Sequence, residues 1–319
     1  DLVGGEFDEV ASTLLPLESH LWQFRRGEQS YRDVFGRTPT IFGRRRFGLA
    51  RHVFQLLNRQ EFLFVTHFCF DDGTFPTKAE PKARWEAPDS TTVEGLARIP
   101  VAADSALSFL KFPSILSQTM IADFVATVAL VHWPMPDVPW YEDLLRMTRY
   151  ANVFARFSTL SNYFQTTDPP AISSSISSDD YASPFLVHAH GHGSRQPISE
   201  FAQHHRARAR FEAVRWLDAV ERSIRAQPAP DEELLNSLES KIELQNPEAT
   251  QHLDSAEQSA FQRVSSFLCP PRPTTQPGTL VVNTLGFDRR VQVPLPPSAL
   301  AETGDSGTLP DADSANRWV

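Results

Sequence analysis

Cysteines and long apolar runs are both scarce in this sequence of 319 residues. Its two cysteines, Cys69 and Cys269, lie 200 residues apart, which excludes a disulfide scaffold and a cysteine-based metal knuckle. The longest apolar run, Phe124–Trp133, has about ten residues and is interrupted by Thr127 and His132, whereas a membrane-spanning helix needs roughly twenty. The sequence therefore predicts no membrane span.

Positive charge is in deficit as well. Lysine and arginine together number 30 against 39 aspartates and glutamates, so the formal net charge at pH 7 is -9. An acidic protein has no field that attracts a phosphate backbone, and we therefore expect no nucleic-acid partner. The content of 41% hydrophobic and 22% charged residues is typical of a globular protein and excludes a disordered or collagen-like chain.

The two ends of the sequence indicate a piece of a longer protein. The chain begins at Asp1, without an initiator methionine, and it ends after a stretch rich in Gly, Asp, Ser and Pro between Glu302 and Asn316. A signal or transit peptide could precede such a piece, so the sequence predicts neither a compartment nor an oligomeric state.

The first half of the chain alternates strand-like and helix-like segments. Pro16–Phe35 has apolar residues at helical spacing, with Pro16 suited to the first turn and Gly36 to the end. Phe62–Phe70 is a nearly unbroken aromatic and β-branched run, typical of a strand buried on both faces of a parallel sheet. Further strands are predicted at Thr40–Gly43, Thr91–Ile99 and Phe124–Trp133, and helices at Ala50–Asn58, Asp104–Leu110 and Trp140–Tyr150. This alternation predicts an α/β fold over residues 1–165.

The second half predicts three further regions. Residues 166–196 are rich in Ser, Pro, Asp and His and indicate a linker. Residues 197–270 predict a helical bundle, and residues 271–319 the start of a β domain and a disordered tail. The expected bundle helices are Pro197–Ala226, Asp231–Leu244 and Asp254–Leu268, the last opening with the capping-box-like pair Asp254 and Glu257.

A series of short motifs runs through the α/β region. In chain order they are Gly4-Gly5-Glu6-Phe7-Asp8-Glu9, Leu14-Leu15-Pro16-Leu17-Glu18-Ser19, Phe42-Gly43-Arg44-Arg45-Arg46-Phe47-Gly48, Phe75-Pro76 and Arg84-Trp85-Glu86. They resemble the later half of the catalytic domain of glycoside hydrolase family 38, the α-mannosidases. There, a Gly-Gly turn precedes a Glu-Ser at a helix start, and the strand that carries the nucleophile ends near a Phe-Gly. Residues 278–289 look like the entry to that family's β domains.

The resemblance implies a fold, an activity and a metal. The fold would be the later half of a seven-stranded, barrel-like parallel α/β domain, followed by a helical bundle and the start of a β domain. The activity would be hydrolysis of an α-mannoside, with a carbohydrate as ligand. The family binds a zinc ion, but its first ligands would lie before Asp1. We therefore expect no cofactor in this chain alone, and a zinc ion only in a longer, full-length protein.

The departures from the family pattern concern the zinc and the nucleophile. Aligning Phe47-Gly48 on the family's Phe-Gly places Arg45 where the nucleophilic aspartate, also a zinc ligand, would lie. A guanidinium cannot attack an anomeric carbon, and it repels both a zinc ion and an oxocarbenium-like transition state. The family's last zinc-ligand segment has no match, since Gln203-His204-His205 continues as Arg206-Ala207-Arg208. We therefore expect a degenerate active site, or alternatively a non-catalytic carbohydrate-binding or scaffold protein that retains the fold.

Candidate ligand-binding residues follow from the rule that reactive groups gather at the carboxyl ends of parallel strands. The rule marks Arg44 to Phe47 and His67 to Asp72 as the rim, and the candidates for substrate binding are Arg45, Asp71, Asp72, Trp85, Glu86, His132 and Trp133. Five of these residues have a structural alternative: a turn for the two aspartates, a packed indole for Trp85, a solvated carboxylate for Glu86 and a structural imidazole for His132.

Two clusters remain. Among Arg44, Arg45 and Arg46, alternation along a strand turns at least one guanidinium inward, where it needs an anion. We expect that anion to be Asp71, Asp72 or Glu86, or else a carboxylate or phosphate on a ligand. His188, His190 and His192 alternate but lie in the expected linker, and we predict no metal site there.

Overall fold

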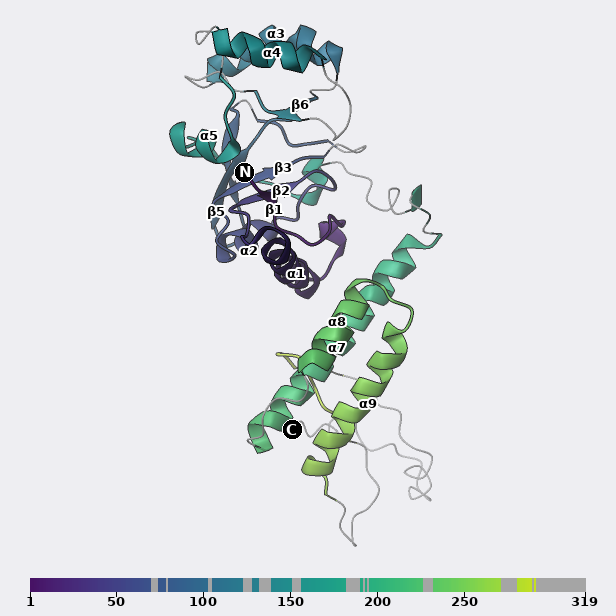
Figure 1. Ribbon diagram of the computed structural model, residues 1–319. Helices are drawn as coiled ribbons and strands as arrows, with labels where there is room; N and C mark the ends of the chain where they lie inside the picture. Colours follow the sequence, from purple (N-terminus) through teal and green to yellow (C-terminus); the bar gives the residue numbers. More distant parts are fainter. Residues whose placement is uncertain are drawn as a thin grey trace. The chain divides into compact units, whose positions relative to one another are not determined.

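The computed structural model describes residues 1–69, 74–78, 80–102, 105–122, 128–131, 139–150, 156–181, 190–191, 193, 195–225, 232–270, 280–288 and 290. The chain forms two compact units, Asp1–His205 and Arg206–Val319, called here the N-terminal and C-terminal units. The N-terminal unit holds a mostly parallel sheet with helices, and the C-terminal unit is helical (Figure 1). The predicted α/β region followed by helices is confirmed.

A six-stranded sheet forms the core of the N-terminal unit. Its strands, in spatial order, are β1 (Val3–Gly4), β2 (Ile41–Arg44), β3 (Phe64–His67), β5 (Thr92–Leu96), β4 (Lys82–Glu86) and β8 (Ser173–Ser175). Every neighbouring pair is parallel except β4 and β5, which are antiparallel. The strands expected near residues 40, 65 and 95 are therefore present and parallel to one another.

Helices cover both faces of this sheet. The register pairs Phe42 with Val65, and both side chains lie on the face that carries α1 (Leu17–Phe35) and α2 (Val53–Arg59). The opposite face carries α5 (Leu160–Thr166), where Phe164 stacks on Phe64 with ring centroids 4.4 Å apart. Burial on both faces explains why the run around β3 is so continuously apolar.

Local residues set the ends of α1. Pro16 precedes its first turn in an extended conformation, and Gly36 ends it with φ of 68°. Gly5, with φ of 140°, follows β1, and a Cβ there would lie 2.5 Å from the Phe62 ring. Only glycine combines that backbone conformation with that close approach, so the glycine pair lets the chain leave β1 tightly against the core.

A second, smaller sheet lies in the same unit. Its two parallel strands are β6 (Val101–Ala102) and β7 (Leu130–Val131), and α3 (Ala106–Ala122) connects them in sequence. Helix α4 (Pro139–Tyr150) follows. The strand expected around residue 128 is therefore β7, but it pairs with β6 rather than with the main sheet.

The expected linker over residues 166–196 is wrong for residues 173–181. Strand β8 pairs with β4, and the 3-10 helix η2 (Ser178–Tyr181) ends in a tyrosine whose side chain is completely buried in the core. Serine-rich composition is typical of loops, but here strand β8 supplies backbone pairing at a sheet edge, and Ile176 and Tyr181 supply core packing.

Three helices make up the bundle: α7 (Pro197–Arg225), α8 (Glu232–Glu243) and α9 (Ala249–Leu268). Their inward stripes form one apolar cluster, with Phe211, Leu238 and Leu253 among its buried members. The helical prediction for residues 197–270 is confirmed. The predicted start of the last helix at Asp254 is wrong, because α9 begins five residues earlier, at Ala249.

The expected β domain has no strand among the residues described there, 280–288 and 290. Asn283 instead closes a short turn, donating from Nδ2 to the Phe287 carbonyl and accepting from the Leu285 amide. Val282 packs against the bundle cluster. The rest of the expected β domain and tail lies outside the described residues.

Candidate functional site

The carboxyl ends of β1, β2 and β3 bring three ionisable side chains to one edge of the sheet. Arg44 is the last residue of β2 and is in register with His67, the last residue of β3. Glu6 lies two residues beyond the end of β1, the other neighbour of β2. Because residues in register on parallel strands point to the same face, Arg44 and His67 lie side by side on the face that α1 and α2 cover.

Arg44 is buried and incompletely paired. Its side chain is 0% exposed, and its Nη1 lies 3.6 Å from Oε1 of Glu6, whose side chain is 3% exposed. Its Nη2 donates to the Val10 carbonyl. Its Nε and Nη1 have no hydrogen-bond partner in the part of the chain that the structure describes. A buried guanidinium with two free N–H groups is costly unless something accepts from them.

Glu6 titrates close to neutral pH. Burial raises the pKa of its carboxyl to about 7, although the positive charge of Arg44 opposes the shift. Neither carboxyl oxygen accepts a hydrogen bond from the described residues. Around pH 6 the group is therefore mostly protonated, and it then leaves the charge of Arg44 unbalanced.

His67 lies in an aromatic cage. Its ring centroid is 5.3 Å from Phe75 and Trp85, 5.7 Å from Phe54 and 5.8 Å from Tyr181. Burial, together with the charge of Arg44, lowers its pKa to about 3, so the imidazole is neutral at physiological pH. Neither ring nitrogen has a hydrogen-bond partner among the described residues.

Two further histidines lie near Arg44. His20 in α1 and His52 at the start of α2 pack edge to face, with centroids 4.9 Å apart. Burial, with the neighbouring His52, lowers the pKa of His20 to about 4, and burial also lowers the pKa of His52. Nε2 of His20 lies 2.9 Å from the Ser12 carbonyl, which only accepts, so this nitrogen carries the proton. We call Glu6, His20, Arg44, His52 and His67 the Arg44 cluster.

Arg45 lies outside this cluster. Its side chain is 54% exposed, and both its backbone amide and its Nε contact Oε1 of Glu9, at 3.2 and 3.4 Å. The acidic side chains that contact Arg44 and Arg45 among the described residues are Glu6 and Glu9, which follow β1, while the expected partners Asp71 and Asp72 lie outside the described residues. The pairing expected with Glu86 is wrong.

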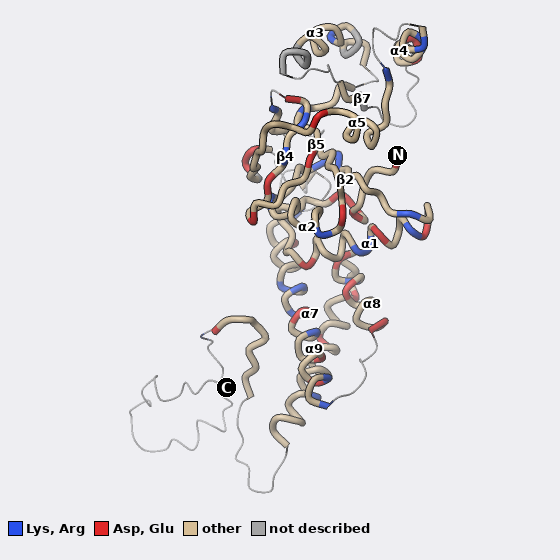
Figure 2. Tube along the Cα trace, turned by 90° about the vertical axis from the view of Figure 1, so that its left-hand side faces the viewer, with Lys and Arg blue, Asp and Glu red and all other residues tan. Residues whose placement is uncertain are grey.

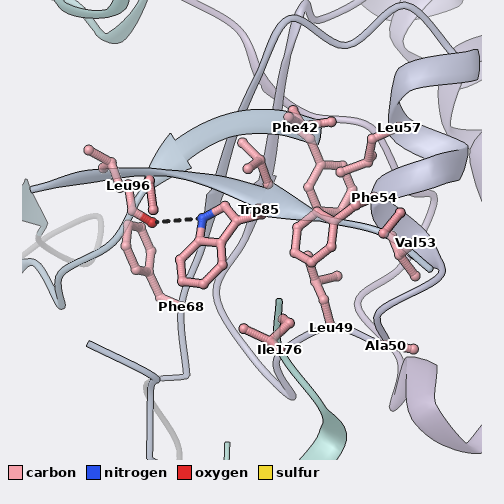
Figure 3. Packing of buried hydrophobic residues seen from close by; sticks show 14 of the residues in the cluster. Phe42, Leu49, Ala50, Val53, Phe54, Leu57, Phe68, Trp85, Leu96 and Ile176 are labelled. Carbon is pink, nitrogen blue, oxygen red and sulfur yellow. Dashed lines mark hydrogen bonds between the residues drawn. The ribbon is translucent and has the colours of Figure 1, made fainter. Parts of the chain in front are cut away.

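Trp85 is a core residue. Its side chain is completely buried, stacks on Phe54 and donates from Nε1 to the Leu96 carbonyl at 3.3 Å (Figure 3). A ring enclosed on both faces has no surface left for a sugar, so the predicted stacking role does not fit and the packed-indole alternative does.

Glu86 lies away from the predicted cleft. Because β4 is antiparallel to β5, Glu86 pairs with Thr92 at the start of β5 and lies at the amino-terminal edge of the parallel strands. Its Oε2 accepts from Ser173 at 3.3 Å. Glu86 and Trp85 also point to opposite faces of the sheet, so they cannot contact one ligand together.

The other predicted positions divide into two groups. Asp71, Asp72, His132 and Trp133, like His188 and His192, lie outside the described residues. His204 is buried and its Nε2 lies 2.9 Å from Oγ of Ser19, while Nε2 of His205 lies 3.0 Å from the Leu14 carbonyl. These two imidazoles fasten the start of α7 to the start of α1, a structural role.

Sequence reasoning missed Glu6, His20 and His52. His67 and Arg44 fall within the predicted rim, but Glu6 was quoted only as part of a glycine turn motif. The signal that could have found it is its place two residues after a short strand that precedes α1, the same carboxyl-end rule applied to β1.

Among the described residues, no three His, Cys, Asp or Glu side chains are grouped so as to hold a metal ion. The position aligned with a zinc ligand is Arg45, and its neighbour Arg44 is a buried cation, so these residues do not fit a zinc ion. None of the described helices is both long and apolar enough to cross a membrane.

Similarity to known proteins is found among solved structures. No protein-family model and no curated protein matches this chain. Among solved structures, an α-mannosidase from Enterococcus faecalis V583 is similar over 83% of this chain, at 13% identity and a TM-score of 0.48. The chain spans 33% of the length of that protein.

Proposed function

We propose that the N-terminal unit is a carbohydrate-binding domain of the glycoside hydrolase family 38 type that lacks the family's hydrolytic residues. The motifs that carry the resemblance support this. The glycine pair Gly4-Gly5 ends β1 and begins the turn that leaves it, Glu18-Ser19 lies in the first turn of α1, and Phe47-Gly48 follows β2. The positions of these three motifs at a strand end, a helix start and a strand end support the proposal.

The observation that carries the proposal is the pairing of charges beyond β2. A retaining glycosidase needs one carboxylate as nucleophile and a second as acid and base. At the end of β2 stand two guanidinium groups, and the carboxylates that follow β1 face them: Glu6 faces Arg44 and Glu9 faces Arg45. A guanidinium can neither attack the anomeric carbon nor accept a proton, so the family's reaction cannot proceed through Arg45.

The test measures hydrolysis and binding separately. The purified chain, with and without added zinc, should release no 4-nitrophenol from 4-nitrophenyl α-D-mannoside, and Arg45→Asp should not restore release. Saturation-transfer NMR with methyl α-mannoside should detect sugar binding. Zinc-dependent turnover by the unaltered chain would contradict the loss of hydrolysis, and absence of sugar binding would contradict the carbohydrate-binding half.

A further inference from the structure

We propose that the Arg44 cluster is a buried receptor for the carboxylate group of a small acid. This inference does not depend on the sugar-binding proposal, because it concerns the unpartnered buried donors of Arg44 and His67 and would hold whether or not the chain binds a sugar. It begins from the location: the carboxyl ends of β1, β2 and β3 supply Glu6, Arg44 and His67 to one edge of the sheet, where α/β proteins bind their ligands.

The cluster offers more donors than acceptors. Arg44 presents unpartnered N–H groups at Nε and Nη1, and the neutral His67 ring carries one N–H, also without a partner among the described residues. Glu6 adds a donor when it is protonated. Because none of the described residues accepts from these N–H groups, an occupant that satisfies them carries oxygens with negative charge.

The net charge of the cluster also favours an anionic ligand. The histidines of the cluster are neutral at physiological pH, because burial holds the pKa of His20 near 4 and of His67 near 3, and it also lowers the pKa of His52. Burial also places the pKa of Tyr181, which faces His67, well above its usual value. Below pH 7 the five described side chains of the cluster therefore carry the positive charge of Arg44, while Glu6 is mostly neutral.

Burial limits the size of the occupant. The side chains of Arg44 and Glu6 are 0% and 3% exposed, and His67 is completely buried. A whole sugar ring cannot reach the guanidinium without a rearrangement of the surrounding chain, whereas a group of the size of acetate needs much less room. A carboxylate also matches a guanidinium in geometry, since its two oxygens accept from two N–H groups.

Glu6 makes the binding depend on pH. As the pH rises through about 7, Glu6 ionises, stops donating and itself neutralises Arg44. If only the protonated form binds, the competent fraction falls about tenfold between pH 6 and pH 8, and the apparent affinity falls with it. Two further acids described near this edge, Asp8 and Glu9, raise the pKa of Glu6 slightly through their charge, and Glu9 contacts the exposed Arg45.

The experiment is isothermal titration of the full chain with acetate at constant ionic strength. At pH 6 acetate should bind saturably, and acetamide, a neutral molecule of nearly the same shape, should not. Arg44→Met should weaken acetate binding at least tenfold. Arg51→Met, which removes an exposed guanidinium outside the cluster, should leave it unchanged.

The Glu6→Gln variant can test the proposal even if the Arg44→Met variant fails to fold. It should bind acetate at pH 6 and lose the roughly tenfold weakening at pH 8. Equal behaviour of acetate and acetamide, or no binding of either, would overturn the proposal, as would a Glu6→Gln variant that keeps the pH dependence.

Two further ligands answer two separate questions. Glucuronate tests where the carboxylate comes from, and methyl α-mannoside tests the sugar-binding proposal. Acetate binding without glucuronate binding would support a small free acid as the ligand. Glucuronate binding in competition with acetate would overturn the size limit and identify an acidic sugar as the source of the carboxylate. Methyl α-mannoside tests the sugar-binding proposal alone, so either proposal can fail while the other holds.

Discussion

Each of the two units buries an arginine, and the two arginines differ in how many carboxyl groups contact them. In the C-terminal unit, Arg208 of α7 donates to Glu239 at 2.6 Å, Glu212 at 2.7 Å and Glu243 at 2.9 Å. In the N-terminal unit, Arg44 has one carboxyl group at 3.6 Å, and burial favours the neutral form of that group. Both terminal nitrogens of Arg208 donate to carboxylates and only its Nε lacks an acceptor, whereas both Nε and Nη1 of Arg44 lack an acceptor among the described residues.

The difference separates a structural arginine from a functional candidate. Burial by itself would lower the pKa of Arg208, but the charge and hydrogen bond of Glu239, with the charges of Glu243 and Glu212, raise it above its usual value. Such an arrangement links α7 to α8 at one register. Figure 2 shows basic and acidic positions interspersed along the three bundle helices. Arg44, at the carboxyl end of β2, does not have three carboxylates around it among the described residues. A buried charge that is only partly neutralised is typical of binding sites.

The largest expected effect comes from Arg208→Met. The substitution leaves Glu239 and Glu243, whose side chains are 3% and 2% exposed, without their cation. Breaking a buried pair in this way costs about 3–5 kcal/mol. Hydrogen exchange of the α7 and α8 amides should report that loss. Arg210→Met is the control, because its partners Asp254 and Glu257 are 60% and 39% exposed, and it should cost less than about 1 kcal/mol.

The next effect is the pH dependence of the N-terminal unit. Glu6 has a folded-state pKa of about 7, raised from 4.5, so its contribution to stability is present below pH 4.5 and is lost as the pH rises through 7. Glu6→Gln should therefore be more stable than the unaltered chain by roughly 3 kcal/mol at pH 8 and nearly equal near pH 4.5. The lowered histidine pKa values act in the opposite direction but are the same in both proteins.

Hydrogen exchange of the β2 and β3 amides at several pH values measures this difference. A Glu6→Gln variant that is less stable than the unaltered chain at pH 8 would show that the ionised carboxylate forms a favourable ion pair with Arg44. Both buried arginines would then form stabilising ion pairs, and they would differ only in the strength of those pairs.

Arg44→Met tests the contrast directly. Glu6 can remain protonated once the arginine is gone, so no buried charge is stranded, and the main loss is the hydrogen bond to the Val10 carbonyl. An unsatisfied buried acceptor costs about 1–3 kcal/mol. The loss, read from exchange of the β2 amides, should therefore be smaller than that of Arg208→Met. A loss as large as that of Arg208→Met would contradict the unequal pairing.

Part of the fold was predictable because its signals are local. Pro16 and Gly36 bound α1 as predicted, since the backbone angles of each suit one end of a helix. The aromatic and β-branched run at Phe62–Phe70 predicted β3, because only a strand covered on both faces makes such a run favourable.

What failed depended on partners distant in sequence. Nothing near β4 indicates that it runs antiparallel to β5, yet that direction moves Glu86 to the other edge of the sheet. Likewise, Asp254 and Glu257 form a capping-box spacing, but they pair with Arg210 of α7, and α9 begins at Ala249. For Arg45, the family alignment indicated the position but not that Glu9 would be its partner.

The smallest expected effect concerns the exposed pair of Arg45 and Glu9. This pair gives the value of an exposed arginine contact, against which the two buried arginines can be compared. Their side chains are 54% and 23% exposed, and Nε lies 3.4 Å from Oε1, so water screens the attraction. A double-mutant cycle with Arg45→Met and Glu9→Gln should give a coupling of about 0.2–1 kcal/mol, measured by exchange of the β2 amides and reduced at high salt. A coupling above about 2 kcal/mol would mean that Arg45 is held as firmly as the buried Arg208. It would also mean that the carboxylates following β1 have arginine binding, rather than ligand binding, as their main role.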